Sequence, residues 1–470
     1  MKGFASQVAV PLSLALLLAS CGQTSTANRA ASAPPTAAAA GTSAADTYAA
    51  RQALLPTLTP EATAPGQATD LSTALPGGRK LSAQAVDKSV PIILVHGMIG
   101  FGRDELGGVV KYWGGFFDVQ EDLKALGYQV YTASVGPFSS NWDRAAELYA
   151  QIKGGCVDYG AAHSQEFGHT RNDPAKCYPG FYPQWDAAHP INLIGHSMGG
   201  PTSRMLVKLL DDGSPANAAE GNLYTGGRAG WVRNVMTISS PNDGSQAADN
   251  IQTLIPQLQK LVVTAGGLLG VNDTQYSVYD FDLGQWGLRR QPGESLSSYA
   301  DRAAHSHMME TKDSCAWDLR PDGAKEQNAF IGRSKVTRYF SWATSATHAG
   351  LLTGWHYPDV TMGAELLPTA YPFPRPLTPG MGNVFGKSAF GGVTYDSRWW
   401  ENDGIAPSNY MDAPIGQPSE AYTGQPTQNG GWYRLGKLSG WDHLDITGNL
   451  TLRGVRDFYR NQAAFLSIQN

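Results

Sequence analysis

The 470-residue sequence carries little charge, few cysteines and no excess of basic residues. Charged residues make up 16% of the chain, and 35 Lys and Arg stand against 40 Asp and Glu, which gives a formal net charge of -5. Because nucleic-acid-binding proteins need a basic face, this balance argues against nucleic acid as the main partner. The 54 glycines and 29 prolines are too few for a collagen-like or wholly disordered chain. A hydrophobic share of 42% is enough for the core of one large domain or two ordinary ones.

Aromatic residues are nearly absent from the first 80 positions, where only Phe4 and Tyr48 occur. Residues 1–20 contain an apolar stretch that is too short to span a bilayer and indicates an export signal. The stretch ends in Leu-Ala-Ser-Cys, which resembles the lipobox of bacterial lipoproteins. We therefore predict that Cys21 is lipidated and tethers the protein to a membrane. The alternative is an ordinary secretory signal in which Cys21 has no role.

The next segment, residues 21–88, is rich in Ala, Ser, Thr and Pro and poor in large apolar residues. Such a composition cannot bury enough apolar surface to fold alone, so we expect a flexible linker. The folded domain is predicted to span residues 89–470. We expect an exported protein that is either lipid-anchored to the bacterial cell envelope or released outside the cell. The sequence does not indicate an oligomeric state.

Three cysteines lie within the predicted domain, Cys156, Cys177 and Cys315. Outside the cytoplasm one pair can oxidise, and three pairings are possible. The pair of Cys156 and Cys177 would close a short loop and is favoured. Three buried free thiols are the alternative.

From residue 89 onward, short apolar β-branched runs alternate with helical patterns. This alternation is typical of an α/β fold, in which helices flank a mostly parallel central sheet. Strands are predicted at residues 91–95, 128–135, 191–195, 232–239 and 337–346, and helices at residues 118–126, 143–152 and 198–210.

The most informative segment is Gly195-His-Ser-Met-Gly199, where a buried strand leads through G-x-S-x-G directly into an amphipathic helix. This is the context of a nucleophile elbow, in which a serine lies on a sharp turn at the carboxyl edge of the sheet. A bare G-x-S-x-G fixes only three positions and can occur by chance, but the flanking strand and helix make it specific. Ser197 is therefore predicted to be a catalytic nucleophile.

A serine nucleophile needs a histidine as general base and an acid that orients the histidine. On this fold the chain order is Ser, then Asp or Glu, then His. The histidines far enough beyond the nucleophile are His305, His307, His348, His356 and His443. His443, near the C-terminus and after the last predicted strand, is the expected base. Asp403, in an Asn-Asp-Gly turn, is the candidate acid, and spacing alone leaves Glu401, Asp396 and Asp359 open as rivals.

Several longer segments carry a more specific signal. They are His96-Gly-Met-Ile-Gly100, Tyr112-Trp-Gly-Gly115 and residues 135–144, 157–163, 278–281, 285–294 and 400–405. Over about residues 89–465 the chain resembles the zinc-containing thermoalkalophilic bacterial lipases. The resemblance implies an α/β-hydrolase fold with a helical lid and a small zinc-binding insertion. It also places the nucleophile, acid and base on Ser197, Asp403 and His443.

The oxyanion that forms during ester cleavage needs backbone donors. These are usually the N–H after the nucleophile and one N–H from the loop after the first long strand. Met198 and Met98 occupy these places. In the lipase family that the chain resembles, Gln commonly stands at the position of Met198 and Phe at the position of Met98. Because the donors are backbone groups, we expect the side-chain change to alter the pocket wall more than the chemistry.

The resemblance further implies a zinc site whose four ligands match Asp143, His163, His169 and Asp313. Without the resemblance, the two histidines would indicate surface residues. Two carboxylates and two neutral imidazoles neutralise one divalent ion, and four protein ligands with no open position describe a structural site. The segments expected to build the zinc-binding insertion are about residues 137–185 and 275–320.

Calcium is a second ion that the resemblance implies. Its matching ligands are the backbone carbonyl of Thr361 and the carboxylate of Asp445, which is one methylene shorter than the family's Glu. Where the family has an Asp-Pro pair, this chain has Leu450-Thr451, with Asn449 adjacent. A hard cation prefers several oxygen ligands including carboxylates, so this loss weakens the expected binding.

A lid over the cleft is expected at about residues 241–270. Its apolar residues recur at helical spacing and are Ile251, Leu254, Ile255, Leu258, Leu261 and Val262. Pro256 is predicted to divide them into two helices. The alternative is that these residues face a permanent core.

Three function classes remain. The first is a carboxylic ester hydrolase, expected to be a triacylglycerol lipase that meets its lipid substrate at an interface. The second uses the same triad on short soluble esters or for acyl transfer to an alcohol. The third is a non-enzymatic cell-envelope lipoprotein, and the complete set of Ser197, Asp403 and His443 speaks against it.

Overall fold

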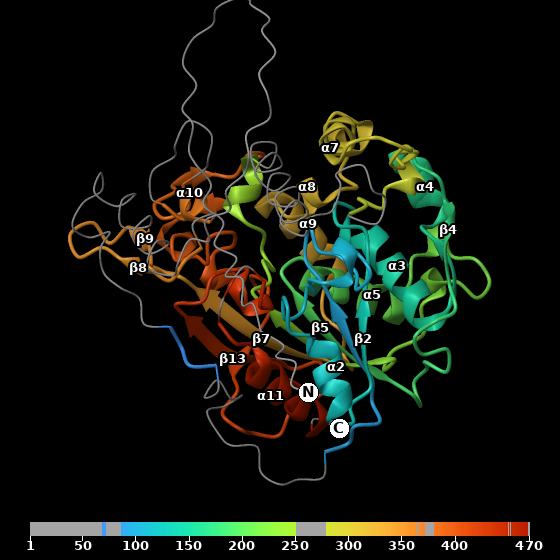
Figure 1. Cartoon of the computed structure of the whole chain (residues 1–470), viewed down its shortest axis with the longest axis horizontal. Coiled ribbons are helices and arrows are strands. Elements are labelled where there is room, and N and C mark those ends of the chain that lie inside the picture. The colour runs from blue at the N-terminus through green and yellow to red at the C-terminus, as the bar shows by residue number, and fades with distance from the viewer. Residues whose placement is uncertain are drawn as a thin grey trace, which may run out of the picture.

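The centre of the molecule is a seven-stranded sheet with helices on both faces (Figure 1). The computed structural model describes residues 68–71, 86–250, 279–363, 366–371, 380–449, 451 and 453–468. The predicted signal with Cys21, most of the predicted linker and the six apolar residues of the predicted lid lie outside the described residues. Within the described part, no helix has both the length and the apolarity that a membrane span requires.

The sheet has the strand order β12-β13-β7-β6-β5-β1-β2, and every neighbouring pair is parallel. Its strands are β1 (Ile92–Val95), β2 (Val130–Ala133), β5 (Ile191–His196), β6 (Val232–Ile238), β7 (Arg338–Ser345), β12 (Glu420–Ala421) and β13 (Trp432–Ser439). Because parallel strands end at one edge, the loops that follow β1, β5, β7 and β13 come together there. The α/β fold predicted from the sequence is confirmed.

Helices cover the sheet on both sides. The helices that contribute to the two cores of the sheet are α2 (Val119–Ala125), α3 (Asn141–Lys153), α5 (Gly199–Asp211), α9 (Pro321–Ile331) and α11 (Arg456–Ile468). The other helices of the described part are α4 (Ala161–Phe167), α7 (Leu296–Ala304), α8 (Cys315–Asp318) and α10 (Leu367–Ala370). On β1, Ile92 and Leu94 pack in the core beneath α2 and α11, whereas Ile93 and Val95 pack in the core beneath α3, α5 and α9. Alternate side chains of one strand thus serve two hydrophobic cores.

All five predicted strands and all three predicted helices are present, with ends that differ by a few residues. The strand β13 was not predicted. It contains the exposed Arg434 and Lys437, and its pairing with β7 shifts register at Gly436. Charge and a glycine bulge thus break the apolar pattern by which a buried parallel strand is recognised.

Small two-stranded sheets extend from this framework. They pair β3 (Gly155–Asp158) with β4 (Asn172–Tyr178), β8 (Thr347–Ala349) with β9 (His356–Pro358), and β10 (Gly386–Lys387) with β11 (Thr394–Tyr395). Cys156 and Cys177 lie opposite each other in the first pair and form a disulfide, which confirms the favoured pairing. Cys315 is a buried free thiol.

Residues 68–71 lie inside the range predicted as linker, yet they contact the domain. The N–H of Thr69 donates to the Ser439 carbonyl at 2.7 Å, and the indole of Trp441 donates to the Thr69 carbonyl at 2.6 Å. Leu71 is buried in the core beneath α2 and α11. Residues 68–71 pack on the domain because burying the Leu71 side chain removes apolar surface from water.

Candidate active site and metal centre

A sharp turn between β5 and α5 carries Ser197. Its φ angle is +54°, which is rare for a residue with a side chain and marks a locally strained backbone. A Cβ at Gly195 would meet the backbone of Gly199, and a Cβ at Gly199 would meet the carbonyl of Val95 on β1. The two glycines of G-x-S-x-G are therefore required for strand and helix to pack this closely.

The turn directs Ser197 toward two other buried residues. Ser197 Oγ lies 2.8 Å from His443 Nε2, and His443 Nδ1 lies 2.8 Å from Asp403 Oδ2. All three side chains are buried. The three residues come from the loops after β5, β7 and β13, so the fold assembles them at one edge of the sheet. This is the arrangement of a serine, a base and an orienting acid.

The rival acids have other partners. Glu401 pairs with Lys437 Nζ at 2.7 Å, Asp396 pairs with Arg398, and Asp359 accepts from His348 at 2.7 Å. Among the contacts of the described residues, none of these three side chains forms a hydrogen bond with His443. Geometry therefore favours Asp403 over each rival.

The Asp403 carboxylate is held by four donors. Its Oδ1 accepts from the backbone N–H groups of Ile405 and Ala406 at 3.1 and 2.9 Å. Its Oδ2 accepts from the hydroxyl of Thr344 at 2.7 Å in addition to His443. These contacts fix the plane of the carboxylate, so it can orient the His443 imidazole.

A second hydrogen-bond chain links two loops of the site through His196. The Gly97 N–H donates to the Tyr112 hydroxyl at 3.0 Å, and this hydroxyl lies 2.6 Å from His196 Nδ1. His196 Nε2 lies 2.9 Å from the His443 carbonyl oxygen. Burial lowers the pKa of His196 well below its ordinary value, so the ring is neutral and donates from Nε2. Sequence reasoning missed this role, although His196 stands inside the G-x-S-x-G motif.

The two predicted oxyanion donors lie on segments next to Ser197. Met198 is buried at the start of α5, and Met98 lies in the loop after β1. A Cβ at Gly97 would meet the Ser197 side chain, so this loop packs directly on the nucleophile. Neither methionine N–H donates to another group in the described part of the chain. Both groups are therefore available to a substrate oxygen.

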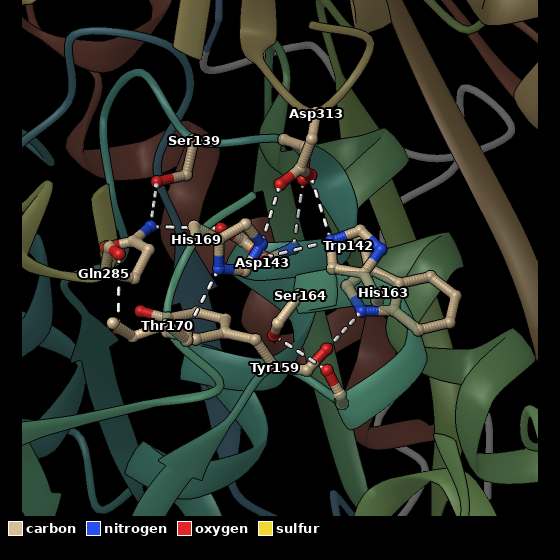
Figure 2. A network of polar contacts seen from close by, with 12 residues as sticks. Ser139, Trp142, Asp143, Tyr159, His163, Ser164, His169, Thr170, Gln285 and Asp313 are labelled. Carbon is tan, nitrogen blue, oxygen red and sulfur yellow. Dashed lines mark hydrogen bonds and ion pairs between the residues drawn. The ribbon is translucent and has the colours of Figure 1, made fainter. Parts of the chain in front are cut away.

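A second polar cluster lies in the insertion beside α3 and α4 (Figure 2). It contains Asp143, His163, His169 and Asp313, whose candidate ligand atoms all lie within 4.8 Å of one another. His163 Nε2 and His169 Nε2 each lie 3.1 Å from an Asp313 oxygen, and His163 Nε2 lies 3.4 Å from Asp143 Oδ1. The structure thus brings together the four residues expected to hold zinc.

The polar atoms that face one another in this cluster lack hydrogen-bond partners. They are Asp143 Oδ1, His163 Nε2, His169 Nε2 and both carboxylate oxygens of Asp313. Leaving buried polar atoms without partners is costly, and a metal ion among them would satisfy all five. Burial lowers the pKa of His163, but the nearby negative charges of Asp143 and Asp313 outweigh it and raise that pKa to about 10. The carboxylates thus favour a positive charge at this position, which a divalent cation can supply.

Outer contacts orient the four ligands (Figure 2). His169 Nδ1 lies 2.9 Å from the Thr170 carbonyl, which leaves Nε2 facing the cluster. Gln285 Nε2 donates to Asp143 Oδ2 at 3.0 Å, and the Trp142 indole stacks on the His163 ring at 4.7 Å between centroids. Such partners fix tautomer and direction in metal sites. The cluster could therefore hold a metal ion.

The residues expected to hold calcium are placed differently. Asp445 Oδ2 accepts from the Arg453 guanidinium at 2.9 Å, so a fixed cation already faces this carboxylate. Thr361 was expected to contribute its backbone carbonyl, and its buried hydroxyl, which has no hydrogen-bond partner among the described residues, does not replace a carboxylate. Leu450 lies outside the described residues, and Thr451 supplies no carboxylate. This set does not fit a calcium site.

Comparisons with known proteins agree with this geometry. The family model described as "Lipase-like, C-terminal domain" matches residues 88–468. "Lipase 2" of Staphylococcus aureus is 33% identical over 384 residues, which cover 79% of this chain and 52% of the relative. The chain therefore spans about half the length of the curated relatives it matches.

Two solved structures are similar over most of their length. EstA from Clostridium botulinum is 38% identical, has a TM-score of 0.74, and is matched over 86% of this chain and 92% of that one. Lipase 1 from Pelosinus fermentans is also 38% identical, has a TM-score of 0.69, and is matched over 81% and 98%.

Proposed function

The chain belongs to the lipase-like C-terminal domain family, and from this membership we propose that it is a serine ester hydrolase that acts on triacylglycerols. The observation that carries the proposal is the continuous contact from Ser197 through His443 to Asp403 at a strained strand–helix turn. A non-enzymatic lipoprotein would not need this buried geometry.

The side chains perform ester cleavage in two half-reactions. His443 Nε2 takes the proton of Ser197 as the serine oxygen attacks the ester carbonyl, and Asp403 stabilises the imidazolium. The backbone N–H groups of Met98 and Met198 stabilise the oxyanion. His443 then protonates the leaving alcohol. In the second half-reaction His443 takes a proton from water as the water oxygen attacks the acyl-enzyme, and it returns this proton to Ser197 as the acid product leaves.

Rates of hydrolysis of esters with increasing acyl-chain length distinguish a lipase from an esterase. We expect higher rates on emulsified long-chain triacylglycerol than on short soluble esters, because the proposed substrate is presented at an interface. The measurement is the initial rate across p-nitrophenyl esters of increasing acyl length, together with titrated release of fatty acid from the emulsion. Preference for short esters with no release from the emulsion would replace the lipase with an esterase.

The metal of this proposal is zinc. Two imidazoles and two carboxylates suit zinc, and four protein ligands leave no position for a reacting water, so the ion is structural. Bound zinc would neutralise the two buried carboxylates and connect α3 and α4 to the segment before α8. Asp143 and His163 come from those helices, and Asp313 from that segment.

Replacing His163 with alanine should reduce zinc from about one ion per chain to a small fraction and lower the melting temperature by several degrees or more. The initial rate at low temperature should change much less, because none of the four ligands contacts the triad. Elemental analysis, thermal unfolding and rate measurements check these three effects. His189→Ala is the matched control, since this exposed histidine pairs with Asp186 and with no other acid among the described residues. Equal stability of metal-free and metal-loaded protein would contradict the zinc proposal.

The proposal includes export and a lipid anchor at Cys21. Its support is the short apolar stretch ending in Leu-Ala-Ser-Cys. Cys21→Ser should move the protein from the membrane fraction to the soluble fraction, because the acyl chains can no longer be attached. Fractionation of cells that express the full chain measures this shift, and Ser20→Ala is a neighbouring control. Unchanged partitioning of Cys21→Ser would contradict the anchor.

A further inference from the structure

Arg453 contacts the loop that carries His443 at three points. Its Nη1 donates to the Gly440 carbonyl at 2.6 Å and to Asp445 Oδ2 at 2.9 Å. Its guanidinium carbon lies 3.5 Å from the centre of the Trp441 ring. One side chain thus binds the loop on both sides of the proposed general base.

Other contacts also hold this loop: the N–H of Trp441 donates to the Ser345 carbonyl at 3.2 Å, and the N–H of His443 donates to the Asp403 carbonyl at 3.0 Å. Trp441 is fixed on a second side by its hydrogen bond to the Thr69 carbonyl. Asp442 is buried and accepts from the backbone N–H groups of Leu444 and Asp445 within the loop, and from Gly363 outside it. The loop thus contains two acids, Asp442 and Asp445, and the Arg453 guanidinium is the charged donor to the Asp445 carboxylate.

The same carboxylate is the one expected to bind calcium. Calcium needs six to eight oxygen ligands, usually with several carboxylates. Among the described residues, the group of acids and histidines close enough to share a metal ion is the zinc cluster, and Asp445 is not part of it. A guanidinium supplies the positive charge here in a fixed position, with directed N–H donors that an ion does not have.

We propose that Arg453 is a positioning residue that takes the place of a calcium ion in holding the His443 loop. The inference rests on the proposed hydrolase function for its effect on rate, but not for its effect on stability or ion binding. Because this cation is covalently part of the chain, the loop keeps its shape at any calcium concentration, whereas an ion contributes only in proportion to its occupancy.

Three variants of the full-length protein test the proposal. Arg453→Met keeps the aliphatic stem against Trp441 but removes the charge and the donors, and Arg453→Lys restores the charge. Arg460→Met is the matched control, because Arg460 forms an equally close pair with Asp122 between α11 and α2. Each protein is freed of calcium on a chelating resin, and its zinc content is measured before and after.

The wild type should show the same kcat and melting temperature without calcium and with calcium raised to the millimolar range. Arg453→Met should lose about tenfold in kcat with little change in KM, because a displaced base impairs the chemical step more than substrate binding. Its melting temperature should fall by roughly 2–4 °C. Arg453→Lys should recover part of kcat, and calcium but not magnesium should recover part of the loss in Arg453→Met. Arg460→Met should keep its kcat and show no response to calcium.

Two results would overturn the proposal. One is a wild type that binds calcium stoichiometrically and gains stability from it, since the ion would then act beside Arg453. The other is an Arg453→Met variant with the kcat and melting temperature of the Arg460→Met control. If the wild type hydrolyses no ester, the hydrolase function fails, and the melting temperatures and calcium-binding measurements still decide the role of Arg453.

Discussion

Replacing Ser197 with alanine is expected to reduce kcat for ester hydrolysis by about a millionfold, to the residual rate that oxyanion donors and binding can support. The cause is the loss of the Oγ that lies 2.8 Å from His443 Nε2. The fold should be kept, since alanine retains the Cβ and no other hydrogen bond of the Ser197 hydroxyl is described. Rates measured with a chromogenic ester and an unchanged melting temperature check both parts.

Ser203→Ala is the matched control for this loss. Ser203 is also buried and lies on α5, where its hydroxyl donates to the Gly199 carbonyl at 2.7 Å. It should keep nearly the full rate. A serine-directed phosphonate should add its mass to the wild type and to Ser203→Ala but not to Ser197→Ala. Substantial turnover by Ser197→Ala, or labelling at another residue, would remove Ser197 from the nucleophile's role.

The nucleophile segment could be predicted from the sequence because its determinants are local. The strand, the two glycines of the turn and the helix follow one another without a gap, and the structure shows that both glycine positions have no space for a Cβ. The acid is a different case. Asp403 and its rival Glu401 are two positions apart, and only the path of the loop decides that Asp403 faces His443 while Glu401 faces Lys437.

The metal cluster and the loop contacts depend on long-range packing. The spacing of His163 and His169 gives no indication that Asp313, far along the chain, completes their site. Resemblance to a family supplied that ligand, and the orphaned atoms of the cluster now give it a physical reason. Arg453 shows the reverse case. Its contacts with Gly440 and Asp445 depend on the path of the chain before α11. Neither the local sequence pattern nor the family resemblance indicates that path.

Asp403 has a geometry that makes an asparagine variant especially informative. Its Oδ1 accepts from the backbone N–H groups of Ile405 and Ala406, so the amide oxygen of the introduced asparagine must take that position. The amide nitrogen then takes the place of Oδ2 and faces His443 Nδ1 and the Thr344 hydroxyl. An NH₂ group there can only donate. The variant should therefore stay hydrogen-bonded and folded, but His443 Nδ1 would face a hydrogen-bond donor instead of an acceptor.

We expect Asp403→Asn to reduce kcat by about 10⁴-fold with little change in melting temperature. The donating amide holds Nδ1 of His443 as an acceptor, so the ring proton moves to Nε2, which can no longer accept the proton of Ser197. Asp359→Asn is the matched control, because Asp359 also pairs with a histidine at 2.7 Å but is not hydrogen-bonded to His443. It should retain nearly the full rate. A near-normal rate in Asp403→Asn, with a large loss in Asp359→Asn, would transfer the role of the acid to Asp359. Equal small losses in both would show that His443 needs no orienting carboxylate.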